Sequence, residues 1–488
     1  MRKLWQFTFA LLVLTVAVAA HAQFSVLYNF GSESGDPYAP YLPGIVAQGR
    51  DGNLYSTTSQ GGANGFGAVF KITPARTLTV LYSFDGTTGF TPNGGLTLGT
   101  DGNFYGTTEV GNTDYGTIFK ITPGGHFTVF YTFTNASDGA FPAAPPVQGT
   151  DGNFYGTTCG NTCNQEASGS GTVYKITPAG QITPMYQFDS THGNAPVAPL
   201  VQGTDGNFYG TTTGGGTKGG GVIFRITPAG KLTVLHNLNL TTDGFAPYAG
   251  LVQGTDGNFY GTTPVGGASG NGTIFKITPA GEFHVLHNMN GSTEGGNPFA
   301  GLVQATDGNF YGANANFGAA SAGCPTGCGT LFKITPNGSY TVLYNFDGTS
   351  GANPFVTPFQ HTNGVLFGTT TGGGTGNVSP CAPGVCGVFY RWSARLRAFV
   401  SLLPTSGKVG KTIEFLGQGL TGTKTVSFNG ASASFAVKSD TYLRAVVPCG
   451  ATSGFVTVTS PSGTFKSNKK FRVIPSSEAF SEFPHESG

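Results

Sequence analysis

The chain has 488 residues with a formal net charge of +1, and only 10% of its residues are charged. This near-zero net charge gives no electrostatic reason to expect nucleic acid or an anionic membrane surface as a partner. Aromatic residues make up 12% of the chain and glycine occupies 80 positions. That composition excludes a disordered chain and a long charged helix, and it favours a turn-rich β protein.

Residues 1–22 have the features of a Sec-type export signal. Arg2 and Lys3 precede an apolar stretch from Phe7 to Ala20, and Ala20-His21-Ala22 fits a signal-peptidase site. A membrane anchor is the weaker alternative, because the stretch is shorter than the roughly 20 residues of a membrane span. We therefore expect a mature chain that starts at Gln23 and has no membrane span.

Residues 23–394 contain one unit repeated seven times, at intervals of 50 to 56 residues. The phrase Asp-Gly-Asn-Phe-Tyr-Gly-Thr-Thr, or a variant of it, begins at Asp51, Asp101, Asp151, Asp205, Asp256, Asp307 and Asn363. Each copy is followed by a variant of Gly-Thr-Ile-Phe-Lys-Ile-Thr-Pro. A third phrase, Thr-Val-Leu-Tyr-x-Phe, follows in the first six units.

Each unit predicts four short strands. Asp-Gly at the start of the first phrase is a strong hairpin signal, because these residues tolerate the positive φ of a type I′ turn. Pro-Ala-Gly, as at Pro228 to Gly230, predicts a second tight turn. Four strands in about 50 residues is the size of a propeller blade, and a stacked solenoid is the alternative.

The third phrase decides between these folds. It is missing after Trp392 but occurs at the start of the mature chain, from Phe24 to Phe30. We predict that this N-terminal strand pairs with the strand around Val388 to Arg391 and closes the ring, which removes exposed sheet edges. The predicted fold class is all-β, with a seven-bladed β-propeller over residues 23–394.

These phrases resemble a known family. Pro-x-Ala-Gly-Leu-Val-Gln-x-x-Asp-Gly-Asn-Phe-Tyr-Gly-Thr-Thr, followed by Gly-Gly and Gly-Thr-Ile-Phe-Lys-Ile-Thr-Pro, is similar to the Gloeo/Verruco (GloVer) tandem repeat of exported bacterial proteins. The resemblance implies a secreted, periplasmic or surface protein of a bacterium, and it implies no activity or catalytic residue. Asp-Gly-Asn-x-Tyr-Gly-Thr is also similar to the repeats of two-component regulator propellers, whose transmembrane and kinase parts this chain lacks.

Residues 399–475 change to period-two apolar alternation, as in Ile413-x-Phe415 and Val456-x-Val458, separated by Gly, Asn and Pro turns. This pattern predicts a small immunoglobulin-like β-sandwich. It resembles an IPT/TIG domain, which implies a spacer or adhesion role. Cys449 departs from that pattern, and we expect a buried free thiol there. Residues 476–488 are expected to form a flexible tail.

The other six cysteines form three close pairs. They are Cys159/Cys163, Cys324/Cys328 and Cys381/Cys386. Each pair lies in one of the three longest loops between the second and third strands of a unit. We expect three local disulfides, because exported proteins meet an oxidising compartment. Zinc held by Cys324, Cys328, Cys381 and Cys386 is the alternative.

Alternating strand directions place the loops between strands two and three on the same edge as the loops that lead to the next unit. We expect this variable edge to be the binding face. The loops to the next unit contain the acids Asp36, Asp85, Asp138, Asp189, Asp243, Glu294 and Asp347, and the aromatic residues Tyr38, Phe90, Phe141, Tyr248, Phe299 and Phe355. Carboxylates beside aromatic rings suit a sugar site or glycosidase chemistry. The alternative is that the acids are turn residues and the rings cover the blade ends.

No unit contains a convincing Ser/His/Asp set, nucleophile elbow or phosphate-binding glycine loop. We therefore expect no catalytic residue, cofactor or metal. The sequence predicts a noncatalytic, monomeric scaffold that binds an extracellular glycan or protein through this edge. A secreted polysaccharide-active enzyme, a glycosidase or lyase, is the alternative. The most divergent loops are poor in charge, which favours binding.

Overall fold

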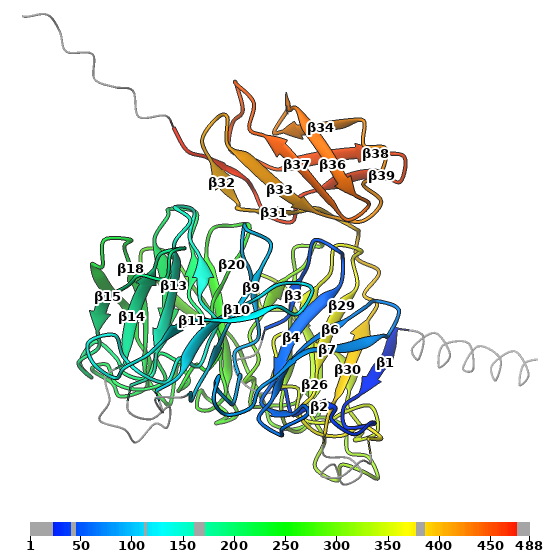
Figure 1. Cartoon of the computed structure of the whole chain (residues 1–488). Coiled ribbons are helices and arrows are strands. Elements are labelled where there is room, and N and C mark those ends of the chain that lie inside the picture. Colours follow the sequence, from blue (N-terminus) through cyan, green and yellow to red (C-terminus); the bar gives the residue numbers. More distant parts are fainter. Residues whose placement is uncertain (1–22, 41–44, 112–114, 161–170, 377–385, 476–488) are drawn as a thin grey trace, which may run out of the picture. The chain divides into compact units, whose positions relative to one another are not determined.

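The computed structural model describes residues 23–40, 45–111, 115–160, 171–376 and 386–475 (Figure 1). Every element of secondary structure in these residues is a β-strand. The described part of the chain has no helix that is long and apolar enough to cross a membrane. Contacts divide the chain into two compact units, with the boundary between Ala398 and Phe399. The predicted signal (1–22) and tail (476–488) lie outside the described residues.

The first unit contains, in its described residues, seven four-stranded antiparallel sheets, numbered 1 to 7 in chain order. Sheets 1 to 6 use strands that are consecutive in the chain, apart from the short strand β5. Sheets 1 to 3 are β3 (Ala47–Gln48), β4 (Leu54–Thr58), β6 (Ala68–Ile72), β7 (Leu78–Ser83); β8 (Thr97–Leu98), β9 (Phe104–Thr108), β10 (Thr117–Ile121), β11 (Phe127–Thr132); and β12 (Val147–Gln148), β13 (Phe154–Thr158), β14 (Thr172–Ile176), β15 (Ile182–Gln187). Sheets 4 to 6 are β16 (Val201–Gln202), β17 (Phe208–Thr211), β18 (Val222–Ile226), β19 (Leu232–Asn237); β20 (Val252–Gln253), β21 (Phe259–Thr263), β22 (Thr273–Ile277), β23 (Phe283–Asn288); and β24 (Val303–Gln304), β25 (Phe310–Asn314), β26 (Thr330–Ile334), β27 (Tyr340–Asn345).

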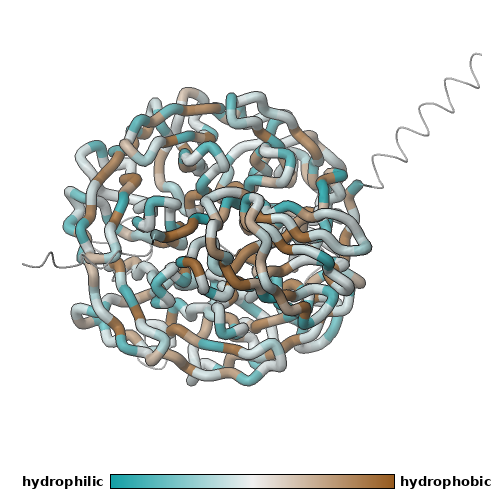
Figure 2. Tube along the Cα trace, turned by 90° about the horizontal axis from the view of Figure 1, so that it is seen from above, coloured by the Kyte–Doolittle hydropathy of each residue, from teal (hydrophilic) through white to brown (hydrophobic). Residues whose placement is uncertain are grey.

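Sheet 7 combines both ends of the first unit. Strands β28 (Phe359–Gln360), β29 (Leu366–Thr369) and β30 (Val388–Trp392) are joined by β1 (Phe24–Asn29). The register pairs Phe24 with Trp392 and Asn29 with Val388. The predicted pairing of the N-terminal strand with this segment is therefore confirmed. Figure 2 shows the trace of the first unit following a circular outline when seen from above.

The repeated Asp-Gly-Asn phrase builds the turn between the first two strands of a sheet. In sheet 5, the Asp256 carboxylate accepts the backbone N–H of Asn258 at 3.2 Å and the hydroxyl of Tyr260 at 2.7 Å. Gly257 has a φ of +89°, which a residue with a side chain rarely adopts. The same bonds recur at Asp51, Asp101, Asp151, Asp205 and Asp307. These acids are turn residues, as the sequence predicted.

Neighbouring sheets are joined by two repeated contacts. A tyrosine of one sheet packs on a phenylalanine of the next, with ring centroids 3.9 to 4.1 Å apart in Tyr55–Phe104, Tyr105–Phe154, Tyr155–Phe208, Tyr209–Phe259 and Tyr260–Phe310. A glutamine oxygen also accepts a threonine N–H of the preceding sheet, in Thr100–Gln148, Thr150–Gln202, Thr204–Gln253, Thr255–Gln304, Thr306–Gln360 and Thr362–Gln48. Between sheets 1 and 2, Leu98 replaces the glutamine, and Arg50 donates to the Thr100 carbonyl at 2.8 Å instead.

The second unit has two further four-stranded antiparallel sheets. One consists of β31 (Ser401–Leu403), β33 (Thr412–Leu416), β37 (Tyr442–Val446) and β36 (Phe435–Ser439), and the other of β35 (Ala431–Ser432), β34 (Thr425–Phe428), β38 (Val456–Ser460) and β39 (Gly463–Lys466). A parallel pair, β32 (Ser406–Gly407) with β40 (Arg472–Val473), lies beside them. The buried Phe415 and Phe428 bring the two sheets into contact, with ring centroids 5.9 Å apart.

The prediction for Cys449 is wrong in one respect. The thiol is free but exposed rather than buried. Cys449 lies in the turn after β37, where the Ala451 N–H donates to the Pro448 carbonyl. This turn lies beyond the strands that form the core, so the apolar pattern around it does not bury it.

Candidate functional site

Two sets of loops meet at one edge of the first unit, which we call the loop rim. Loops that lead into a sheet form β-bridges with that sheet's own loop between strands two and three. The bridged pairs are Phe90–Val110, Asn194–Gly214, Phe245–Val265, Gly296–Asn316 and Ala352–Gly372, and β2 (Pro37–Tyr38) pairs with β5 (Gln60–Gly61) in the same way. The two loop types therefore lie together, as strand alternation predicted.

A residue in the left-handed backbone region precedes a proline in all seven loops to the next sheet. These residues are Ala39, Thr91, Phe141, Ala195, Ala246, Asn297 and Asn353, with φ between 48° and 58°. Such φ values are costly for residues other than glycine. They are held in place by hydrogen bonds: the Ser59 N–H donates to the Ala39 carbonyl at 3.2 Å, and the Thr371 N–H to the Asn353 carbonyl at 3.1 Å. Sequence reasoning missed this feature, although the aligned prolines were a signal for it.

The predicted rim acids accept hydrogen bonds from their own loops and, in four cases, from the strand that precedes the loop. Tyr28 donates to Asp36 at 2.7 Å, and Tyr131 donates to Asp138 at 3.0 Å. The equivalent partners of Asp243 and Glu294 are histidines, His236 at 2.8 Å and His287 at 3.2 Å. Asp85, Asp189 and Asp347 accept mainly from loop N–H and hydroxyl groups. Each acid thus stabilises the conformation of its loop. A role of these acids in ligand contact stays a prediction.

The pKa is lowered at four of these acids, Asp85, Asp189, Asp243 and Asp347, and at the first two a hydrogen bond is the largest cause. The Thr88 backbone N–H, with the Thr87 hydroxyl, holds the pKa of Asp85 below its ordinary value. The His192 backbone N–H and ring lower the pKa of Asp189 in the same way. Ionised carboxylates bound to their own loop suit a structural role better than proton transfer.

The six predicted rim aromatics occupy three different loop positions. Tyr38 and Phe90 stand two residues before the proline, inside the bridges to the neighbouring loop. Phe141 directly precedes its proline and has a positive φ. Tyr248, Phe299 and Phe355 directly follow theirs. The six residues therefore do not form one ring of equivalent positions.

The three aromatics after proline form a continuous group, which we call the aromatic row. The ring centroids of Tyr248 and Phe299 are 5.6 Å apart, and those of Phe299 and Phe355 are 5.3 Å apart. All three side chains are partly exposed. The equivalent residues of sheets 2, 3 and 4 are Asn93, Ala143 and Val197. Among the described residues, the row therefore lies in the part of the rim that belongs to sheets 5 to 7, while the equivalent Tyr41 of sheet 1 lies outside the described residues.

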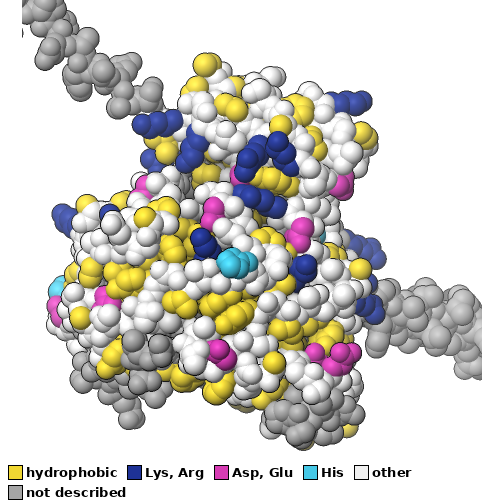
Figure 3. Space-filling model, viewed as in Figure 1, with side chains coloured by type: hydrophobic (Ala, Val, Ile, Leu, Met, Phe, Trp, Pro, Cys, Tyr) yellow, Lys and Arg dark blue, Asp and Glu magenta, His cyan; other side chains and the backbone are white. Residues whose placement is uncertain are grey.

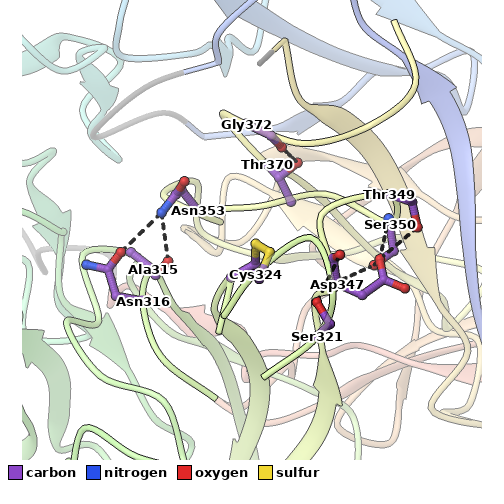
Figure 4. The surroundings of a disulfide bond; sticks show 11 residues. Ala315, Asn316, Ser321, Cys324, Asp347, Thr349, Ser350, Asn353, Thr370 and Gly372 are labelled. Carbon is purple, nitrogen blue, oxygen red and sulfur yellow. Dashed lines mark hydrogen bonds between the residues drawn. A yellow bond between two sulfur atoms is a disulfide. The ribbon is translucent and has the colours of Figure 1, made fainter. Parts of the chain in front are cut away.

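Amide side chains accompany the aromatic row. Asn316 donates to the side-chain oxygen of Asn297, and Asn353 donates to that of Asn316, each at 3.1 Å. Figure 4 shows Asn353 pointing toward Asn316 and Ala315 beside the Cys324 disulfide. The Cys328 carbonyl accepts the Asn353 backbone N–H at 3.0 Å. Sequence reasoning missed these amides because asparagines are common in turns.

One carboxyl group on the rim was also missed. Glu109 follows the Thr-Thr of sheet 2, where the other sheets have Ser59, Cys159, Thr213, Pro264, Ala315 and Thr371. Asn93 donates to Glu109 at 2.7 Å. Burial raises the pKa of Glu109, whereas the pKa of Asp85 and that of Asp189 are lowered. Its departure from an otherwise uncharged repeat position was the available signal.

The cysteines agree with local disulfides where they are described. Cys324 and Cys328 are bonded to each other, so neither is a free thiolate for zinc. Cys159 and Cys386 are also disulfide-bonded, while Cys163 and Cys381 lie outside the described residues. Within the described ranges, no three His, Cys, Asp or Glu side chains are grouped so that they could hold a metal ion.

Comparison with solved structures finds the same kind of fold at low sequence identity. A fungal alcohol oxidase of the AA5 family, solved in complex with copper, aligns with 90% of this chain and 98% of its own, at 12% identity and a TM-score of 0.51. The extracellular domain of a protein assigned as a one-component system from B. thetaiotaomicron aligns with 93% of this chain and 59% of its own, at 10% identity and a TM-score of 0.48. The likeness to the oxidase concerns the fold alone.

Sequence comparison identifies the repeat itself. No curated protein matches the chain. The Gloeobacter/Verrucomicrobia repeat family matches residues 13–164 and 158–381, which together cover more than half of the chain. The chain belongs to the Gloeobacter/Verrucomicrobia repeat family.

Proposed function

We propose that the protein is an exported, noncatalytic module that binds a glycan through the loop rim of its first unit. The observation that carries this proposal is the aromatic row of Tyr248, Phe299 and Phe355. Partly exposed aromatic rings stack on the apolar faces of sugars, and neighbouring amides exchange hydrogen bonds with sugar hydroxyls. A protein ligand at the same rim is the alternative, and the experiment below distinguishes it from a glycan.

The scaffold for this site is a closed seven-bladed propeller in our proposal. Its support is the junction between sheets 7 and 1, which are far apart in sequence. Thr362 donates its backbone N–H to Gln48 at 3.0 Å, and Gln48 returns a bond to the Thr362 hydroxyl at 2.8 Å. Leu54 and Phe367 share a buried cluster at the same junction. These contacts reproduce those of the other junctions, as a closed ring requires.

Export and the role of the second unit belong to the same proposal. The disulfide between Cys324 and Cys328 supports an oxidising compartment, and it suits a secreted, periplasmic or surface location. We assign the second unit to an immunoglobulin-like sandwich of the IPT/TIG type, because two antiparallel sheets share one buried core. In this assignment it presents the first unit as a spacer or adhesion module.

A glycan array tests the site with the mature chain 23–488. The variant Tyr248→Ala/Phe299→Ala/Phe355→Ala should lose about tenfold or more in affinity for any glycan that the unchanged protein binds. The reason is that each aromatic ring stacked on a sugar contributes on the order of 1 kcal/mol. The matched control is Phe130→Ala/Phe435→Ala, two partly exposed rings on strands outside the loop rim. Binding that survives the triple change, or binding only to protein ligands, would contradict the proposal.

Glu109 favours a second candidate, a polysaccharide-active enzyme. A partly buried carboxyl group whose pKa is raised by burial is in the state that a general acid needs. A reducing-end release assay on plant and bacterial polysaccharides tests this candidate. Release that disappears in Glu109→Gln would replace the noncatalytic proposal.

A further inference from the structure

The charge of the chain is divided unevenly between its two units. Residues 399–475 contain nine Lys or Arg and two Asp or Glu, a formal charge of +7, and residues 476–488 add three Glu, whereas residues 23–398 contain 13 and 18, a formal charge of −5. Figure 3 shows dark blue Lys and Arg side chains gathered on the second unit. The near-zero charge of the whole chain hides this difference.

The two acids of residues 399–475 are engaged within the second unit. Glu414 is only 5% exposed and accepts from the Tyr442 hydroxyl at 2.7 Å and from the Arg444 guanidinium at 3.0 Å. Asp440 accepts the backbone N–H groups of Gly419 and Thr421. Most of the positive charge of this unit is therefore not neutralised inside it.

Part of this charge converges on one phenylalanine. The Lys466 ammonium lies 3.8 Å from the centre of the Phe455 ring, and the Lys470 ammonium lies 5.9 Å from the same centre. Among the described residues, no carboxylate lies within ion-pair distance of either ammonium. Arg472 begins β40 two residues after Lys470, and the buried Phe471 stands between them. We call Phe455, Lys466, Lys470 and Arg472 the basic cluster.

The surface beside the basic cluster can make further hydrogen bonds. Lys466 pairs with Thr457 across β38 and β39, and Thr459 pairs with Thr464 on the same face. Ammonium groups that share one ring repel each other, while the ring attracts both. An anion bound between them would remove the repulsion, and the ring and hydroxyl groups would contact the sugar that bears it.

We infer that the basic cluster binds an acidic polysaccharide, a glycan polymer with carboxylate groups. The three cationic groups of the cluster favour a polymer over a single small anion, because they can meet successive charges along it. The ring and the threonine face favour sugar over a lipid surface, which would call for apolar side chains to insert. This role goes beyond the proposed function, since it concerns a different unit and makes it an anchor rather than a spacer.

Retention of the mature chain 23–488 on immobilised polygalacturonate tests the inference, with neutral dextran as the reference surface. The protein should be retained on polygalacturonate and released by salt, and it should not be retained on dextran. Lys466→Gln/Lys470→Gln/Arg472→Gln should lose about tenfold in affinity, because charge-assisted contacts are lost. The control Lys408→Gln/Lys424→Gln/Lys438→Gln removes the same charge elsewhere in the unit and should retain affinity within about threefold.

Three results would overturn the inference. Equal losses in both triple variants would show attraction by net charge alone. Tighter binding to phosphatidylglycerol vesicles or to duplex DNA than to polygalacturonate would assign the cluster to another partner. Unchanged binding in the cluster variant would exclude it as a site. Thermal unfolding of each variant verifies folding, and Lys470→Gln alone, which should weaken binding about threefold, replaces the triple variant if that does not fold.

Discussion

The two units use charged residues in opposite ways. In the first unit, carboxylates such as Asp256 and Asp138 accept bonds from the turns and loops that carry them. In the second unit, Lys466 and Lys470 meet an aromatic ring and no carboxylate among the described residues. A repeat uses the same acid many times to build its turns, so its charge is structural. A single-copy unit leaves its charge available for a partner.

The strongest test of this comparison removes the strand that links the ends of the first unit. Deleting residues 23–30 should expose the edge of β30 and cause aggregation, because an unpaired edge recruits other strands. The second unit shares no strand with this sheet, so its own unfolding transition should remain. Size-exclusion chromatography and calorimetry measure both effects. A monomeric deletion variant with unchanged unfolding would show that β1 is dispensable.

A smaller effect is expected at a single turn. Tyr260→Phe and Asp256→Asn should each lower the free energy of unfolding by about 1–2 kcal/mol, because each weakens the bond between the hydroxyl and the carboxylate. The double variant should cost less than the sum, since both changes affect the same bond. Sheet 7 supports this expectation, because Asn363 and Phe367 replace both partners there. Urea unfolding of the three variants provides the measurement, and strict additivity would refute the coupling.

Acid should weaken the junction of sheets 7 and 1 through His361. This side chain is fully buried; its Nε2 donates to the Gly52 carbonyl at 2.9 Å, and its Nδ1 accepts the Asn363 N–H. Burial lowers the pKa of His361. The unfolded chain therefore takes up the proton first, and stability falls as the pH drops below the ordinary histidine value of about 6.5. His361→Ala, which matches Ala305 of sheet 6, should reduce the slope of stability against pH in this window, and an unchanged slope would exclude the mechanism.

Reduction of disulfides should affect the rim and leave the sheets folded. The bond between Cys324 and Cys328 closes a loop of only five residues, so its entropic contribution is modest, below the roughly 3 kcal/mol of a 15-residue loop. Reduction should weaken the binding of any ligand at the rim, because the Cys328 carbonyl accepts the backbone N–H of Asn353. Without reductant, native and denatured protein should each react with about one equivalent of thiol reagent, the exposed Cys449. Several reactive thiols in the denatured protein would refute the predicted pairing.

The smallest effect on stability is expected at a lysine of the basic cluster. Lys470→Gln should change the free energy of unfolding by less than about 0.5 kcal/mol, because the exposed ammonium makes no ion pair in the described residues. Urea unfolding beside Asp256→Asn tests this contrast directly. A loss as large as that of Asp256→Asn would show that the lysine is structural as well.

The repeat made the strands of the first unit predictable, because a phrase such as Asp-Gly-Asn-Phe-Tyr specifies a turn and the strand after it in every copy. It also made the position of Phe24–Asn29 predictable by counting. The rim was harder to predict from the sequence, because its loops differ in length and its distinctive residues each occur only once in the repeats. Asn316 and Glu109 depart from the repeat singly, and their partners Asn297 and Asn93 come from other loops. Only the folded chain brings such pairs together.

Sheet 7 has a consequence for the order in which the chain can fold. Sheets 1 to 6 each draw their strands from about 50 successive residues, so each can form soon after it is synthesised. Strand β1 precedes its partner β30 by about 360 residues, which corresponds to roughly 20 to 70 s of synthesis at ordinary rates. During that time the first strand made is the last to be paired. A nascent chain must therefore keep an apolar strand unpaired until its final partner has appeared.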